Sequence, residues 1–439
     1  MKATPYEYAV RNGWGVAIRI RRKMQFKLWA RSPVPINHDP QGARLGPCFT
    51  NEVKRMSAWN GFKAVGRGLI LFACLIICGI APLWAGAEVT SDDQTATQTS
   101  QPAENRASFL DKMTFGAFID TYYGYNFNQP ESRKNGLRNF DVNHNQFSLN
   151  LIGLSAELPA EPVGFRIDIN FGDTAKMIHS AEPGGSDLYQ FLKQAYISYK
   201  APVGKGLTVD FGEFVTPLGA EVIESKDNWN YSRSLLFSWA IPYYHFGARL
   251  KYPFSDKFSG SAYIVNGWND VVDNNTGKTF GFSGAINPTK KLSIVQNYMA
   301  GPEQKDDNSD WRHLWDTTVT YTVTPSLSLM GNYDYGMDRA TGSRVKWQGV
   351  AGYARYQITQ RFAMASRLEW YADPEGFTTG STQKVKEGTL TAEFKVKNFL
   401  MRSEYRYDWS DRAVFEKEGN TLSRNQTTIT LGAIFFIGQ

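Results

Sequence analysis

Cysteine is scarce in this chain and is confined to one end of it. The three cysteines among the 439 residues are Cys48, Cys74 and Cys78. All three precede the small residues Ala85 to Ala87, which form a candidate cleavage site. A product that begins after Ala87 has no cysteine. This excludes a disulfide scaffold, a cysteine zinc site and a thiol nucleophile.

Long apolar runs and catalytic motifs are also missing after Ala87. No stretch of about 18 apolar residues occurs there, so the sequence predicts no membrane-spanning helix. It contains no Gly-x-Ser-x-Gly elbow and no Gly-rich phosphate loop. The scattered histidines of this region are His144, His179, His245 and His313. We therefore expect no enzyme, no cofactor and no metal site, while a hydrolase built from converging loops stays an alternative.

The basic character of the whole chain comes from its first 87 residues. They contain 13 Lys and Arg against 3 Asp and Glu, within totals of 48 and 42. The remainder therefore holds 35 basic and 39 acidic residues, a net charge of −4. A nucleic-acid-binding role, which the overall charge of +6 suggests, loses its support.

The sequence before residue 113 predicts an exported protein. Lys63 and Arg67 precede an apolar run from Leu69 to Ile80, which is the pattern of a secretory signal peptide. Because signals normally begin at the N-terminus, Met56 is the expected start. We expect four parts along the chain. These are a mis-annotated extension at 1–55, a signal peptide at 56–87, a disordered periplasmic tether at 88–112 and a transmembrane barrel at 113–439.

Residues 426–438 show a two-faced strand. Every second residue from Ile429 to Ile437 is apolar, whereas the residues between them are Thr, Gly, Ile or Phe, and Gln426 and Thr428 precede them on that other face. Since neighbouring side chains on a strand point to opposite sides, such a strand separates lipid from water. The same alternation recurs from residue 113 onward, and it predicts an all-β, antiparallel up-and-down transmembrane β-barrel. The expected strands are 113–125, 146–157, 163–172, 190–200, 206–214, 244–252, 258–266, 279–287, 291–299, 313–323, 326–335, 345–357, 361–371, 388–397, 398–408 and 426–437.

Short turns alternate with long polar connections between these strands. Such asymmetry is typical of barrels in the outer membrane of Gram-negative bacteria, and lipid requires every strand edge to pair. Tyr and Trp gather where strands meet the long connections, as in an outer aromatic girdle. Lys193 and Glu213 break the pattern. Either both lie close to strand ends, where an outward charge costs less, or the register slips there by one residue. The expected long loops are 126–145, 173–189, 215–243, 267–278, 300–312, 336–344, 372–387 and 409–425.

The third long connection, from 213 to 242, is too apolar for a solvated loop. Sixteen strands leave an aqueous channel, so we expect this connection to fold inward and narrow it. Opposed charges across the gap then sort solutes by charge and dipole. A loop cap or a subunit interface, packed by its aromatic residues, is the alternative. The expected constriction residues are Glu221, Glu224, Asp227, Trp229 and Arg233. The expected pore-wall residues are Arg367, Lys395, Arg402 and Arg406.

Two segments resemble a known family. Residues 216–224, Thr-Pro-Leu-Gly-Ala-Glu-Val-Ile-Glu, and residues 227–234, Asp-Asn-Trp-Asn-Tyr-Ser-Arg-Ser, resemble the signature of the outer-membrane β-barrel porins of the porin-2, OmpL-like group. The opening of the first strand, 115–125, is similar to that group as well. The resemblance covers about 113 to 439 and implies a pore of general or weak selectivity.

The expected function is therefore an outer-membrane porin for passive diffusion of small hydrophilic solutes or ions. A structural or adhesive barrel and a loop-active hydrolytic barrel are the alternatives. The expected partners are outer-membrane lipid, lipopolysaccharide and the solutes themselves, with no nucleic acid and a possible homotrimer. Acidic loops at 306–310 and 270–275 lack the full calcium-loop pattern, and we expect them to be solvated or to meet lipopolysaccharide through shared cations.

Overall fold

The structure is a computed structural model that describes residues 9–11, 17–19, 111–340 and 342–438. The expected extension, the signal peptide and nearly all of the tether thus lie outside the described residues. Two three-residue strands, β1 (Ala9–Arg11) and β2 (Ala17–Arg19), pair with each other. No described helix is long and apolar enough to cross a membrane.

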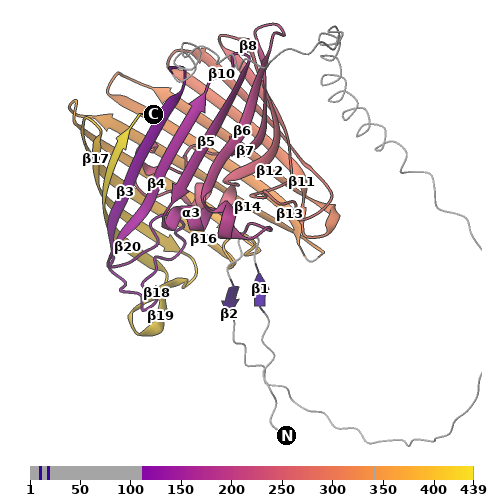
Figure 1. The fold of residues 1–439 in the computed structure, drawn as a ribbon. Coiled ribbons are helices and arrows are strands. Elements are labelled where there is room, and N and C mark those ends of the chain that lie inside the picture. The colour runs from indigo at the N-terminus through magenta and orange to yellow at the C-terminus, as the bar shows by residue number, and fades with distance from the viewer. Residues whose placement is uncertain (1–8, 12–16, 20–110, 341, 439) are drawn as a thin grey trace, which may run out of the picture. The chain divides into compact units, whose positions relative to one another are not determined.

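Sixteen antiparallel strands of the described residues close into one barrel (Figure 1). Each strand pairs with the next along the chain, and the last strand, β20, pairs with the first, β3, to close the ring. The prediction of a sixteen-stranded barrel is confirmed. The strands are β3 (Thr114–Asn126), β4 (Gln146–Leu158), β5 (Val163–Phe171), β6 (Leu192–Ala201), β7 (Leu207–Val215), β8 (Tyr244–Ser255), β9 (Phe258–Val265), β10 (Thr279–Thr289), β11 (Leu292–Gln304), β12 (Asp307–Thr322), β13 (Leu327–Ala340), β14 (Ser343–Gln357), β15 (Phe362–Asp373), β16 (Gln383–Val396), β17 (Phe399–Ser410) and β20 (Asn425–Ile437).

The prediction of long loops at 300–312 and 336–344, two of the eight expected, is wrong. β11 ends at Gln304 and β12 begins at Asp307, so the expected loop at 300–312 is a hairpin with a tight turn. The expected loop at 336–344 is likewise mostly strand, because β13 runs to Ala340 and β14 starts at Ser343. Polar residues in strands that continue beyond the lipid have the composition of a loop. Composition alone therefore cannot separate the two cases.

Three of the remaining long connections, those after β5, β7 and β17, contain short helices or strands at one end of the barrel. The C-terminus and the β18–β19 hairpin lie at opposite ends in Figure 1. Since the seven short turns share the end with the C-terminus, that end faces the periplasm and the long connections face outward. The short elements are α3 (Asp173–Ile178), α4 (Ser186–Tyr189), the 3-10 helix η2 (Ser225–Asp227), the π-helix η3 (Leu236–Ala240), β18 (Phe415–Lys417), η4 (Glu418–Asn420) and β19 (Thr421–Ser423).

The two faces of the wall differ as the alternation requires. Large apolar side chains such as Leu368, Leu431 and Phe435 are exposed on the outer face, where lipid replaces water. Their neighbours along the same strands, such as Arg367 and Thr430, are buried on the inner face. The outer face therefore provides the membrane contact and the inner face provides the polar lining.

The long connections also share an apolar core, which alternation along the strands does not predict. Its buried side chains come from four connections and pack against inward side chains of the wall. Trp347 on β14, for example, donates its indole N–H to the Ala240 carbonyl at 3.0 Å. The connections thus form a folded body rather than separate solvated loops. Members from the connections are Phe140, Ala175, Ile178, Leu218, Ile223, Leu235, Leu236, Phe237, Trp239, Ala240, Ile241, Tyr243 and Phe415.

Candidate functional site

Segment 216–243, which connects β7 to β8, is the longest connection and has little regular structure of its own. Most of its side chains from 221 onward are buried. A buried backbone that lacks helix or sheet partners must find other partners for its N–H and C=O groups. Charged side chains of the wall provide them.

Wall carboxylates accept hydrogen bonds from backbone N–H groups of this segment. Glu404 on β17 accepts from Tyr231 at 2.6 Å and from Ser232 at 2.9 Å. Glu369 on β15 accepts from Leu235 at 2.7 Å, at the start of the π-helix. Glu369 and Glu404 thus each hold two consecutive backbone N–H groups of the segment. Further bonds of this kind are Glu369 with Leu236 and Asp316 with Gly219.

Wall arginines donate to the carbonyl groups of the same segment. Arg367 donates to the backbone carbonyl of Ser232 at 2.8 Å, and Arg406 donates to the backbone carbonyl of Arg233 at 2.6 Å. Arg402 donates to three carbonyls in the stretch 225–230. The N–H and C=O groups are therefore both held, by acids and by arginines on neighbouring strands.

Two glycines on the inner face of the wall make room for the segment. Gly432 on β20 faces Tyr231, and a Cβ at this position would lie 2.4 Å from the tyrosine ring. Gly349 on β14 faces Leu236 in the same way, at 2.7 Å. Contacts shorter than 3 Å force a shift of the neighbour. The inner face is thus shaped for these two side chains.

The expected constriction acids have different ion-pair partners and do not form one site. Glu221 meets Arg367 directly, with the carboxylate 2.8 Å from the guanidinium. Glu224 instead pairs with Lys193 on β6, and Asp227 pairs with its neighbour Lys226 at 2.6 Å. Among the described residues, Glu221 is therefore the only expected constriction acid that forms an ion pair with one of the expected pore-wall arginines.

The other expected residues lie apart from these pairs. Trp229 is partly buried against the shared core. Arg233 is buried and donates to carbonyls of its own segment, with its guanidinium 4.8 Å above the Phe140 ring. Lys395 is exposed at the turn end of β16, 5.4 Å from the Phe436 ring.

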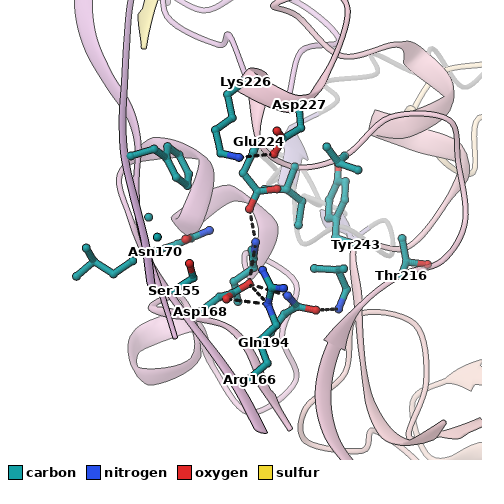
Figure 2. Close-up of a pocket in the computed structure, with 18 of the residues that line it drawn as sticks. Ser155, Arg166, Asp168, Asn170, Gln194, Thr216, Glu224, Lys226, Asp227 and Tyr243 are labelled. Atoms are coloured by element: carbon teal, nitrogen blue, oxygen red, sulfur yellow. Dashed lines mark hydrogen bonds and ion pairs between the residues drawn. The ribbon is translucent and has the colours of Figure 1, made fainter. Parts of the chain in front are cut away.

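A cavity of about 500 Å³ lies between segment 216–243 and the strands β3 to β8. Figure 2 shows Glu224, Lys226 and Asp227 on one side and Asp168, Arg166 and Gln194 across from them. Lys193 bridges the two sides, because its ammonium contacts both Glu224 and Asp168, the latter at 3.0 Å. The cavity therefore has both signs of charge on its walls, arranged in pairs.

A β-bulge explains why Lys193 lies inside. The β5–β6 pairing passes from Asp168 opposite Gln194 to Ile169 opposite Leu192, which leaves Lys193 as an extra residue. Bulges re-aim side chains in this way. The shift of register that Lys193 signalled in the sequence is therefore real. Arg249 on β8, which also lines the cavity and pairs with Asp210 at 2.7 Å, had no signal beyond its inward position.

Within segment 216–243 the charge state of Glu224 follows from its surroundings. Burial alone raises the pKa of a carboxyl group, but the Lys193 ammonium and its hydrogen bond outweigh burial and lower the pKa of Glu224. A lowered pKa stabilises the folded state above the ordinary pKa of Glu, and this contribution is lost as the pH falls through the lowered value. Glu224 therefore stays ionised at neutral pH.

Asp270, in the connection between β9 and β10, is a buried acid without such a partner. Its Oδ2 atom has no hydrogen-bond partner among the described residues. Burial, followed by the carboxylates of Glu303 and Glu182, raises the pKa of Asp270 well above its ordinary value. No group of three or more His, Cys, Asp or Glu in the described part of the chain is arranged to hold a metal ion.

Replacing Asp270 with Asn is expected to stabilise this connection. A raised pKa means that stability falls as the pH rises from about 3.9 toward the folded-state value, and a neutral isostere removes this loss. The expected gain at neutral pH is about 1–3 kcal/mol of local stability. The rate of limited proteolysis within 266–278 measures it. Asp273→Asn is the matched control, because Asp273 pairs with Lys278 and its replacement should not slow cleavage.

The histidines have separate structural contacts. His144 accepts the Asn126 N–H at 2.8 Å, and His179 lies 3.5 Å from Glu213. His313 contacts the Tyr298 hydroxyl at 2.8 Å on the outer face. These contacts place the rings of His144, His179 and His313 in different parts of the wall and its connections.

Comparison with known proteins places the chain among outer-membrane barrels. The family model described as "Putative beta-barrel porin-2, OmpL-like" matches residues 112–437. No curated protein sequence matches the chain. The outer membrane channel DcaP of Acinetobacter baumannii has a similar fold, with a TM-score of 0.51 and 11% sequence identity over 74% of this chain and 97% of that chain.

Two further solved structures are similar to the same extent. The anion-selective porin from Comamonas acidovorans has a TM-score of 0.51 at 11% identity, over 74% of this chain and 99% of that chain. OmpF of Salmonella typhi, in complex with daunomycin, has a TM-score of 0.51 at 12% identity, over 74% of this chain and 97% of that chain. At these identities the likeness concerns the fold alone.

Proposed function

Since this chain belongs to the β-barrel porin-2, OmpL-like family, whose model matches residues 112–437, we propose that segment 216–243 narrows its pore and sets its selectivity. The family and the fold make the protein an outer-membrane channel for passive diffusion of small hydrophilic solutes. Both also point to a non-enzymatic role. The narrowing by segment 216–243 is the finer step, and the hydrogen bonds between its backbone and the wall support it most directly.

The charges that select solutes are those around the cavity. Arg367, Arg402 and Arg406 each form an ion pair with a buried carboxylate, which largely neutralises their fields. The chain of contacts from Asp168 through Lys193 to Glu224 instead crosses from the wall to the segment. A paired lining with both signs favours dipolar and neutral hydrophilic solutes over strongly charged ones.

Single-channel recording tests this function. The full-length protein, purified from outer membranes, is inserted into a planar bilayer under a salt gradient. Discrete conductance steps support a pore, and the reversal potential reports its selectivity. A folded barrel without current contradicts the proposal and favours a structural or adhesive barrel, or one whose loops hydrolyse a substrate.

Replacing Lys193 with Met is expected to make the channel more cation-selective. Glu224 then loses its cation, and Asp168 keeps Arg166 as its one remaining ion-pair partner among the described residues. Without Lys193, burial raises the pKa of Glu224, so this added selectivity should decline on acidification, whereas the wild-type protein should change little down to about pH 4.5. Reversal potentials between pH 7 and pH 4.5 measure both effects.

Lys251→Met is the matched control for this change. Lys251 also pairs with a wall carboxylate, Asp210 at 2.9 Å, but it is partly exposed and Asp210 keeps Arg249 as a second partner. Its replacement should shift the reversal potential far less. Equal shifts for the two variants would argue against a selective role of the Lys193 contacts.

The barrel is also expected to have partners in the outer membrane. Contact with outer-membrane lipid follows from the exposed apolar outer face. Contact with lipopolysaccharide and assembly into a homotrimer are expected, and the mass of the purified protein in detergent tests the trimer.

A further inference from the structure

On neighbouring strands, the outward side chains change from apolar to basic toward the outside of the cell. On β14, Val350 is 49% exposed, and the residues that follow on the same face toward the strand start include Lys346 and Arg344, both exposed. On β16, Leu390 is 50% exposed, and Lys386 and Lys384 follow in the same direction. We call Arg344, Lys346, Lys384 and Lys386 the basic belt.

The register of the sheet brings the belt together. Only β15 separates β14 from β16, so the two strands lie about 10 Å apart, which is two strand spacings of about 4.8 Å. Through β15, Lys384 is level with Gln348 and Lys386 with Val350, so Lys346 lies two residues, about 7 Å, farther along its strand than Lys384 does. On β15, Ala372 lies opposite Lys384 and Trp370 lies opposite Lys386. The four cations therefore follow one another in an oblique row on the outer face, from Lys386 through Lys384 and Lys346 to Arg344.

The side chains of the belt form no ion pair within the described residues, whereas the nearby Arg339 pairs with Asp310 at 3.4 Å. The two neighbouring carboxylates accept backbone N–H groups instead: Glu375 from Lys346 at 3.1 Å and Asp411 from Lys384 at 2.9 Å. Four exposed cations thus lie along the edge of the membrane without an ion-pair partner for their side chains among the described residues, and the two nearest carboxylates are engaged with backbone N–H groups.

Aromatic side chains lie directly below the belt. Tyr333, Tyr405 and Tyr407 are exposed on the same outer face, and the Lys386 ammonium lies 5.7 Å from the Trp409 ring. Tyr and Trp prefer the level of the lipid headgroups. The belt therefore lies at or just above that level, where lipid phosphates lie.

From this arrangement we infer that the basic belt binds the phosphate groups of a phosphorylated lipid of the outer leaflet, of the lipid A type. Lysine and arginine bind phosphate strongly, and the exposed apolar residues below accept acyl chains. This direct contact with cations of the wall is separate from the expected contact of the acidic loops with lipopolysaccharide through shared cations. The inference rests on the proposed outer-membrane location but not on conduction.

The test replaces Arg344, Lys346, Lys384 and Lys386 with Gln together. The probe is bisphosphoryl lipid A, whose binding to the purified full-length protein in detergent is measured by native mass spectrometry. We expect the fourfold variant to bind at least about tenfold more weakly than the wild-type protein. Wild-type binding of dephosphorylated lipid A should be weaker by a similar factor.

A matched control carries the same change of charge at the opposite end of the barrel. It replaces the exposed Lys257, Lys290, Lys291 and Lys397 with Gln and should bind lipid A as the wild-type protein does. Equal binding by the belt variant, an equal loss in the control, or equal binding of the dephosphorylated lipid would each overturn the inference.

Two further measurements keep the outcome clear. A variant with Lys346, Lys384 and Lys386 replaced by Arg preserves the charge and should retain binding, so a loss in this variant contradicts a role for charge. The heat-dependent mobility of each variant on a gel shows that its barrel is folded. Unchanged single-channel conductance in the belt variant separates this inference from the proposed function of the pore.

Discussion

Deletion of residues 217–235 is expected to raise the single-channel conductance about two- to fivefold and to weaken ion selectivity. The deletion removes Glu221, Glu224 and Asp227 together with the backbone that the wall side chains hold. The inner arginines and acids of β15 to β17 then face water directly. Conductance steps of the folded variant in a planar bilayer measure the change.

The control for this deletion is the turn Glu418–Asn420, which is exposed in another connection. Its removal should leave the conductance within experimental error of the wild-type value. If the deletion of 217–235 yields a folded barrel with wild-type conductance and reversal potential, segment 216–243 does not narrow the pore.

Replacing Arg367 with Met is expected to cause the largest loss of stability among single substitutions of the wall. This arginine is fully buried and contacts Glu221 at 2.8 Å and Glu387 at 2.5 Å. Removing one partner of a buried ion pair leaves an uncompensated charge and costs about 3–5 kcal/mol. Urea unfolding in lipid vesicles measures the free energy of unfolding.

Arg355→Met provides the comparison. Arg355 also pairs with a wall carboxylate, Glu393 at 2.7 Å, but its side chain is partly exposed and Glu393 keeps Arg402 as a partner. Loss of such a pair costs about 1 kcal/mol or less. Similar losses for the two variants would mean that the network around Arg367 is not the main support of segment 216–243.

The barrel itself could be predicted because each strand carries its two faces in its own sequence. β20 shows this clearly from Gln426 to Ala433, where the apolar Ile429 and Leu431 alternate with Thr428, Thr430 and Gly432 on the inner face. Where strands leave the lipid, this constraint ends. The hairpins at Gln304–Asp307 and Ala340–Ser343 are polar on both faces, and their composition was therefore mistaken for that of loops.

The site was only partly predictable, for a different reason. The contact between Glu221 and Arg367 joins opposite charges, which the sequence displays. The partner of Glu224 depends on the bulge at Lys193, which is a property of the pairing between two strands. The backbone contacts of Glu369 and Glu404 have no sequence signal at all, because every residue has an N–H group to offer except proline.

The way in which the wall holds segment 216–243 has a consequence for how this pore can change over generations. Glu369, Glu404 and the arginines bind main-chain atoms, which nearly any amino acid provides. If segment 216–243 sets selectivity as proposed, substitutions at positions such as Lys226 and Asp227 are expected to alter which solutes pass while the attachment persists. Side chains of the segment can therefore change from one generation to the next without loss of the backbone contacts that attach the segment to the wall.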